Sequence, residues 1–215
     1  MQLDPRYQPP YAPMLLMHGV REEEKEIARA ITSNLNALST EANNIAAAVA
    51  LFGLCAGKQE RGLWQDWMRV AARDGAMSIR NFGEALAKIR GLIGKVPTWC
   101  SVVDTKALKS AETTFKETFP FAYKMRHSVA HPELYNDPSK KMGISGSMDE
   151  LGIRANDVTN LSIQGLITGV TFASTFEGVL VRYDVSAESL SAIIDITNTC
   201  FSSFQRLEGF RREVR

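Results

Sequence analysis

The chain of 215 residues carries 25 lysines and arginines against 24 aspartates and glutamates, and 45% of its residues are hydrophobic. This hydrophobic content suffices for one sizeable core, so we expect a single domain over residues 1–215. Proteins that bind long nucleic acids by charge alone are strongly basic, and the near-neutral balance excludes that class, so any basic site must be local.

The cysteines and the apolar runs restrict the cellular compartment in which we expect the protein. Cys55, Cys100 and Cys200 are far apart and odd in number, and no CxxC or Cys/His cluster accompanies them. This pattern indicates neither a disulfide framework nor a zinc site, and we expect no metal and no cofactor. The most apolar run, 45–56, is about a dozen residues long, against roughly 20 for a membrane span. We therefore expect a cytoplasmic protein without a membrane partner.

The first half of the chain predicts an extended arm followed by long helices. Four prolines within residues 1–13 favour an extended N-terminal arm over 1–19. Acidic residues at 22–24 suit a helix start, and apolar residues then recur at helical spacing up to Gly57. One long helix, or two joined near Ser39, would fit this pattern.

The segment from Glu60 to Ile93 predicts another long helix, which Gly94 and Pro97 end. Gly75 and Gly83 are weak points in it, because glycine disfavours a helix interior. For Trp64 and Trp67, helical spacing favours packing in the core or at a dimer interface over a platform for stacking bases.

Asp104 offers a cap for a third helical segment that extends to His131. Pro120 is expected to kink or restart this segment. Pro132 is expected to end it, because the residue before a proline is disfavoured in helical geometry.

Strands are predicted before a final helix. Residues 132–160 are rich in Pro, Gly, Asn, Asp and Ser and predict a loop. Segments 166–172 and 179–183 predict a β-hairpin with its turn at Glu177-Gly178. Ser186 can cap the last helix, whose apolar seam continues to Leu207. The expected fold is mainly α: an antiparallel bundle of four or five helices, with the loop and β-hairpin (132–185) inserted before the last helix.

The residues suited to chemistry gather near the predicted end of the third helical segment. Two of the three histidines of the chain, His127 and His131, lie there beside Arg126, and Lys124 precedes them by two residues. Histidine suits proton transfer because its pKa lies near neutrality. Arginine presents a planar, permanently charged fork that matches phosphate oxygens.

The spacing of Arg126 and His131 leaves two arrangements open. On a regular helix, residues five apart point roughly 140° from one another. Pro132 could free His131 from helical geometry and let its ring turn toward the arginine. Alternatively, two copies of the helix could face each other across a dimer and bring both residue types into one cleft.

The segment Arg126-His127-Ser128-Val129-Ala130-His131-Pro132-Glu133 resembles the motif of the HEPN superfamily: an arginine, a polar residue, a few mostly small or apolar residues, then histidine. The resemblance implies a compact helical bundle, usually a homodimer in which the motifs of both subunits line one cleft. Many members are metal-independent endoribonucleases of toxin–antitoxin, phage-defence or RNA-processing systems. Others have lost catalysis or partner a nucleotidyltransferase, so an antitoxin or a nucleotidyltransferase is an expected class of protein partner.

The resemblance also implies roles for the residues. His131 would remove the proton from a ribose 2′-hydroxyl, and Arg126 would stabilise the charge that develops on the attacked phosphate. His127 would protonate the leaving oxygen or orient the phosphate. Lys124, Lys140 and Lys141 are candidate contacts to the RNA, with a solvated pair as the alternative for the last two. DNA would not be cleaved, since it lacks the 2′-hydroxyl.

Alternatives from other classes remain. The chain could be a non-catalytic HEPN-like dimeric module that binds RNA, a nucleotide or a protein. Arg126 and His131 could instead be a polar pair that satisfies carbonyls at a helix C-terminus, where cations are favourable. A coincidental motif in an unrelated helical protein is the third alternative.

Overall fold

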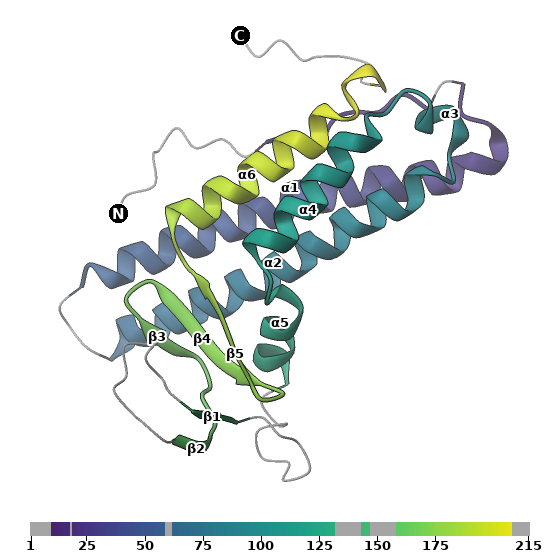
Figure 1. The fold of residues 1–215 in the computed structure, drawn as a ribbon. Helices are drawn as coiled ribbons and strands as arrows, with labels where there is room; N and C mark the ends of the chain where they lie inside the picture. Colours follow the sequence, from purple (N-terminus) through teal and green to yellow (C-terminus); the bar gives the residue numbers. More distant parts are fainter. Residues whose placement is uncertain (1–9, 18, 59–61, 132–142, 147–157, 208–215) are drawn as a thin grey trace.

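Two long antiparallel helices, α1 (Lys25–Ala56) and α2 (Leu63–Ile93), are the longest elements of the chain (Figure 1). The computed structural model describes residues 10–17, 19–58, 62–131, 143–146 and 158–207. The remaining helices are η1 (Glu22–Glu24), α3 (Pro97–Cys100), α4 (Thr105–Thr118), α5 (Ala122–Ala130), α6 (Ala187–Ser202) and η4 (Gln205–Leu207). The strands are β1 (Ile144–Gly146), β2 (Val158–Leu161), β3 (Leu166–Thr168), β4 (Thr171–Phe176) and β5 (Val179–Asp184). The protein is thus mainly helical, with a small antiparallel sheet before the last helix.

Helix α1 is continuous through Ser39, which settles the choice between one helix and two. By length and composition alone, the segment Glu22–Ala56 could cross a membrane. Its apolar side is nevertheless occupied: Ile31, Leu35 and Leu38 are fully buried, and α1 packs against α2 and α6. This burial is the pattern of a core helix.

The expected helix boundaries at Asp104, Pro120 and Pro132 are confirmed. The Asp104 carboxylate accepts hydrogen bonds from the backbone amides of Lys106 and Ala107, both at 3.0 Å, and α4 begins directly after it. The helix is broken between Thr118 and Ala122, around Pro120, so α4 and α5 are separate. Helix α5 ends at Ala130, two residues before Pro132.

The sheet has three strands where the sequence predicted a hairpin. The segment expected to form one strand over 166–172 turns at Gly169, which has a φ of 61°, and forms β3 and the start of β4. The predicted pairing around Glu177-Gly178 is present, with Phe176 opposite Val179. Strand β4 is therefore central, between β3 and β5, and all but its first residue are buried.

The segment expected to be a loop, 132–160, contains further pairing. Ile144 lies opposite Leu161 and Gly146 opposite Val158, so β1 and β2 form a separate two-stranded ladder. Near it, Ile144, Leu161, Leu166 and Leu180 pack around Ile163 and Ala173 on one face of the larger sheet. The opposite face, with Phe172, Phe176 and Val181, belongs to the main core.

The last helix begins where Ser186 was expected to cap it: the Ser186 hydroxyl accepts a hydrogen bond from the Ser189 amide at 3.3 Å. The helix ends at Ser202, earlier than the apolar seam implied. Phe204 lies just before the short helix η4, and Leu207 is its last residue. The end of the N-terminal segment lies beside this C-terminal region, since the Leu16 amide donates a hydrogen bond to the Leu207 carbonyl at 3.1 Å.

Of the two expected placements of Trp67, in the core or at a dimer interface, the core is excluded, since the residue is 44% exposed. Leu63 and Val70, four residues before it and three after it, are exposed on the same side of α2. Trp64 is half-buried, and the Lys58 ammonium lies 5.4 Å from its ring centroid.

Gly75 and Gly83 are positions of close packing rather than weak points. A Cβ at Gly75 would overlap the Tyr183 hydroxyl, which donates a hydrogen bond to the Ala72 carbonyl. A Cβ at Gly83 would overlap the Phe115 ring, whereas a Cβ at Gly91, farther along the same helix, would meet nothing within 4 Å. Helix α2 therefore carries glycine where β5 and α4 approach it.

We expect Gly83→Ala to destabilise the protein by about 1–3 kcal/mol, since overpacking against Phe115 outweighs the gain in helix propensity. Gly91→Ala makes the same chemical change in open space and should stabilise it by up to about 1 kcal/mol. Urea unfolding followed by far-ultraviolet circular dichroism measures both free energies. Shifts of the same sign in the two variants would contradict the packing argument.

Candidate functional site

Helix α5 presents the motif residues on its outer side. Met125, Ser128 and Val129 are buried against the rest of the protein, whereas Tyr123 is exposed and Arg126 and His127 are half-buried. Side chains on a helix advance by about 100° per residue, which separates these two sides. The fully buried Ser128 hydroxyl donates to the Met125 carbonyl at 2.7 Å, so it is not placed as a nucleophile.

His131 lies outside regular helical geometry. Its φ of −124° and ψ of 61° differ from helical values, while its backbone amide still donates to the His127 carbonyl at 3.2 Å. The φ value and the departure from the helical region are expected of a residue that precedes a proline. The half-buried His131 ring stacks on the His127 ring, with centroids 5.7 Å apart and an interplanar angle of 22°.

His127 is the centre of a ring cluster. Besides His131, its ring contacts Tyr123 of the same helix at a centroid distance of 4.5 Å and Phe176 at the end of β4 at 5.7 Å. Two elements therefore hold this imidazole: helix α5, through Tyr123 and the C-terminal His131, and strand β4, through Phe176. The contacts leave it half-buried and restrict its orientation.

A second guanidinium, that of Arg80 from α2, joins the site. Its Cζ atom lies 5.3 Å from the centroid of the Tyr123 ring, and it forms an ion pair with Glu84 one turn along α2. Burial lowers the pKa of Arg80, and the positive charge of Arg126 lowers it further. Arg80 and Arg126 are thus close enough to repel each other, and an anion between them would relieve this repulsion.

The surroundings of His127 disfavour its protonated form. Burial lowers the pKa of His127 most, and the charges of Arg126, His131 and Arg80 add to the effect, against an opposing contribution from Glu177. With a pKa below the ordinary histidine value of about 6.5, this imidazole is neutral at pH 7. It can then accept a proton or share its single N–H.

The lysines predicted to contact substrate have different positions. The Lys124 ammonium lies 3.9 Å from the carboxylate of Glu177 in the β4–β5 turn, with both side chains partly exposed. Lys140 and Lys141 lie outside the described residues, as do Pro132 and Glu133 of the motif.

The sequence did not single out Arg80, Phe176 or Glu177. Arg80 precedes Arg126 by 46 residues and lies on another helix. Its spacing of four residues from Glu84 is that of an ordinary ion pair on a helix surface. Glu177 was noted only as a turn residue. No local signal connects these positions with α5, since the fold alone brings them together.

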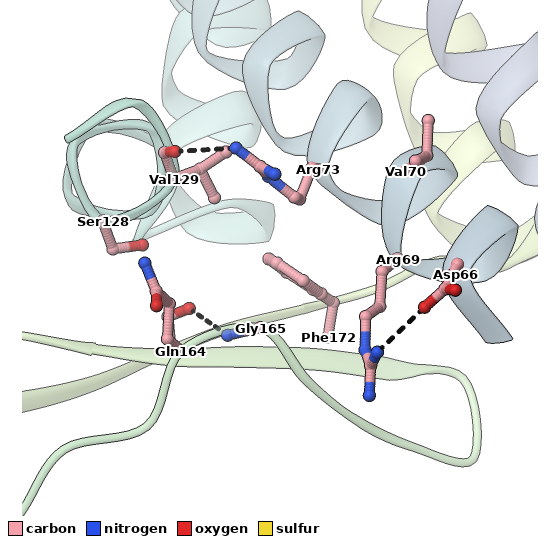
Figure 2. A pocket seen from close by; sticks show the side chains of 10 residues that line it. Asp66, Arg69, Val70, Arg73, Ser128, Val129, Gln164, Gly165 and Phe172 are labelled. Carbon is pink, nitrogen blue, oxygen red and sulfur yellow. Dashed lines mark hydrogen bonds and ion pairs between the residues drawn. The ribbon is translucent and has the colours of Figure 1, made fainter. Parts of the chain in front are cut away.

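A cavity of about 490 Å³ lies under α5, between α2 and the sheet (Figure 2). Arg69 and Arg73 enter it from α2, Gln164 and Gly165 from the segment before β3, and Phe172 from β4. Arg73 donates to the Val129 carbonyl at 3.3 Å near the end of α5. A neighbouring cavity of about 420 Å³ shares Val70, Arg73 and Val129 and reaches Ala130, next to His131.

Comparison with protein families, curated proteins and solved structures gave no match for this chain. Among the side chains that the structure describes, no group of three His, Cys, Asp or Glu residues lies together as metal ligands do. The arrangement that remains is a cluster of two arginines and two histidines on the outer side of α5. Such a cluster can bind an anion and place an imidazole beside it.

We expect His127 to titrate below the ordinary histidine value in a pH series of imidazole carbon–proton NMR spectra, with His127→Asn giving the assignment. Phe176→Ala should raise its pKa by exposing the ring to water. The unfolded chain binds more protons than the folded one between the two pKa values, so this residue makes stability rise with pH across that window. A pKa at or above 6.5 in the wild type would contradict the assignment of burial and arginine charge as the dominant effects.

Proposed function

We propose that the protein is a HEPN-like endoribonuclease that cuts RNA by attack of a ribose 2′-hydroxyl on the adjacent phosphate, without a metal ion. The observation that carries the proposal is the convergence of Arg80, Arg126, His127 and His131 around the exposed side of one short helix. The resemblance of Arg126–Glu133 to the HEPN motif supplies the reaction. The proposal includes a helical bundle of the HEPN kind and a cytoplasmic location.

The roles follow from charge and position. The attacked phosphate lies between Arg126 and Arg80, whose charges stabilise the negative charge that grows on its oxygens. His131 takes the proton of the 2′-hydroxyl, whose oxygen forms the new bond to phosphorus as the bond to the 5′-oxygen breaks, and water supplies the proton to the leaving 5′-oxygen. The lowered pKa of His127 favours a neutral ring that orients the phosphate through its N–H, over the alternative role as proton donor to the leaving oxygen.

A homodimer is part of this proposal, because the motifs of two HEPN subunits usually line one cleft. The exposed side of α5 and the exposed apolar residues Leu63, Trp67 and Val70 of α2 offer surface for such a contact. An antitoxin or a nucleotidyltransferase is the class of further partner that the family resemblance suggests.

We expect the wild-type protein to cut a mixture of structured RNAs in the presence of EDTA and to leave 2′,3′-cyclic phosphate ends. Removal of the general base in His131→Ala should lower the rate by about 10²–10⁴-fold. Arg126→Lys keeps the charge but loses the planar fork and should also cut slowly. Gel separation of end-labelled RNA, with mass spectrometry of the ends, measures these effects.

Lys88→Met is the matched surface control, because Lys88 is exposed on α2 and lines neither cavity described above. It should cut at the wild-type rate. If folded wild-type protein leaves every RNA intact, the ribonuclease proposal fails, and a HEPN-like module that binds RNA, a nucleotide or a protein without cutting becomes the better interpretation. Cleavage that requires a divalent ion would refute the metal-independent mechanism.

A further inference from the structure

Three arginines lie along the part of α2 that borders α5. Arg73 contacts the Val129 carbonyl near the C-terminal end of α5, whereas Arg80 lies over Tyr123 in its first turn, so the two helices run antiparallel here. Arg69 precedes Arg73 by one turn and lines the same cavity. From the rise of a helix, Arg69 and Arg73 are about 6 Å apart along its axis, and Arg73 and Arg80 roughly 10 Å.

This row extends from Arg80, beside Tyr123, to Arg73 and Arg69 at the cavity under α5. The two neighbouring cavities share Arg73 and Val129, and the second one reaches Ala130, which precedes His131. A chain that passes over Arg126 and His131 toward the end of α5 therefore meets Arg73 and then Arg69. Figure 2 shows the guanidinium groups of Arg73 and Arg69 on either side of Phe172, with Gln164 facing Ser128 below α5.

The existing contacts of these arginines leave room for a ligand. Arg69 pairs with Asp66 at 3.2 Å, but both side chains are more than half exposed, and such pairs contribute little. Arg73 gives one N–H to the Val129 carbonyl, and a guanidinium has five donors. Asp74 lines the second cavity, and Glu84 pairs with Arg80, so acidic groups offset part of the positive charge. Binding of an anionic ligand would thus depend more on individual hydrogen bonds from these arginines than on net charge.

We infer that α2 guides a single strand of RNA away from the cleavage site: Arg73 and Arg69 bind the phosphates of flanking nucleotides, and the cavity under α5 receives an unpaired base. A volume of about 490 Å³ falls within the roughly 300–1,000 Å³ of small-molecule sites. The Gln164 amide can donate to and accept from a base edge. An extruded base requires an unpaired strand, which is how proteins usually read RNA sequence. This inference rests on the proposed ribonuclease function.

The test measures binding separately from cleavage. Fluorescence anisotropy at several salt concentrations measures how tightly the whole chain carrying His131→Ala binds a fluorescein-labelled, single-stranded RNA of about a dozen nucleotides. Adding Arg69→Met and Arg73→Met should weaken binding roughly tenfold at low salt and reduce the slope of log K against log salt by about 1.4 for two lost phosphate contacts. Arg69→Met alone leaves the contact of Arg73 with the Val129 carbonyl intact and should reduce the salt slope by about half as much as the double substitution.

Two further variants make the test specific. Arg29→Met is the matched control, since Arg29 is exposed in the second turn of α1 and lines neither cavity, and it should bind as tightly as the parent. Gln164→Ala should weaken binding a few-fold and leave the salt slope unchanged, because the lost contact is to an uncharged base.

The outcomes separate this inference from the proposed function. If the wild type cuts RNA while the arginine substitutions leave RNA binding by the His131→Ala protein unchanged, the strand path is wrong and the ribonuclease proposal stands. If the wild type cuts nothing but binding depends on Arg69, Arg73 and Gln164 as described, the strand path stands and the proposed chemistry fails. Absence of RNA binding by the parent protein would overturn the inference.

Discussion

The approach of Tyr183 to α2 at Gly75 fixes the relation between the sheet and the helices. The buried Tyr183 hydroxyl reaches the Ala72 carbonyl only because position 75 has no side chain. This contact holds β5 against α2, and β4 follows through strand pairing. The β4–β5 turn then places Phe176 against His127 and Glu177 near Lys124. A packing contact between a strand and a helix thus determines the surroundings of a histidine on a third element.

The same helix serves both the core and the candidate site. Ile79, Phe82 and Leu86 of α2 are buried in the main core, whereas Arg69, Arg73 and Arg80 project toward α5 and the sheet. The core packing behind them therefore fixes the backbone positions of the arginines. Helix α5 is only nine residues long and depends on these tertiary contacts for its orientation, because a helix of this length is marginal alone.

The sequence predicted the features that local chemistry decides. Proline at 120 and 132 and caps at Asp104 and Ser186 act on the backbone within a few residues, and the helix ends follow them. The sequence did not predict the third strand because the turn at Gly169 lies inside an apolar run that resembles one strand. Arg80 and Phe176 could not be assigned to the site, since their proximity to α5 arises from packing between segments distant in the chain. The contact between His127 and His131 follows from their spacing of four residues, which makes side chains neighbours on a helix.

If the site binds phosphate as proposed, phosphate binding and proton binding are coupled there by its charges. Burial lowers the pKa of His127 most, and the positive charges of Arg126, His131 and Arg80 lower it further. A phosphate between the arginines would cancel part of their field and raise the pKa of His127. By linkage, protonation of His127 would in turn strengthen phosphate binding as the pH falls. Under the proposed function, the arginines that bind the phosphate also disfavour a charged imidazole before the phosphate binds, while burial, to which Phe176 contributes, has the larger effect on this pKa.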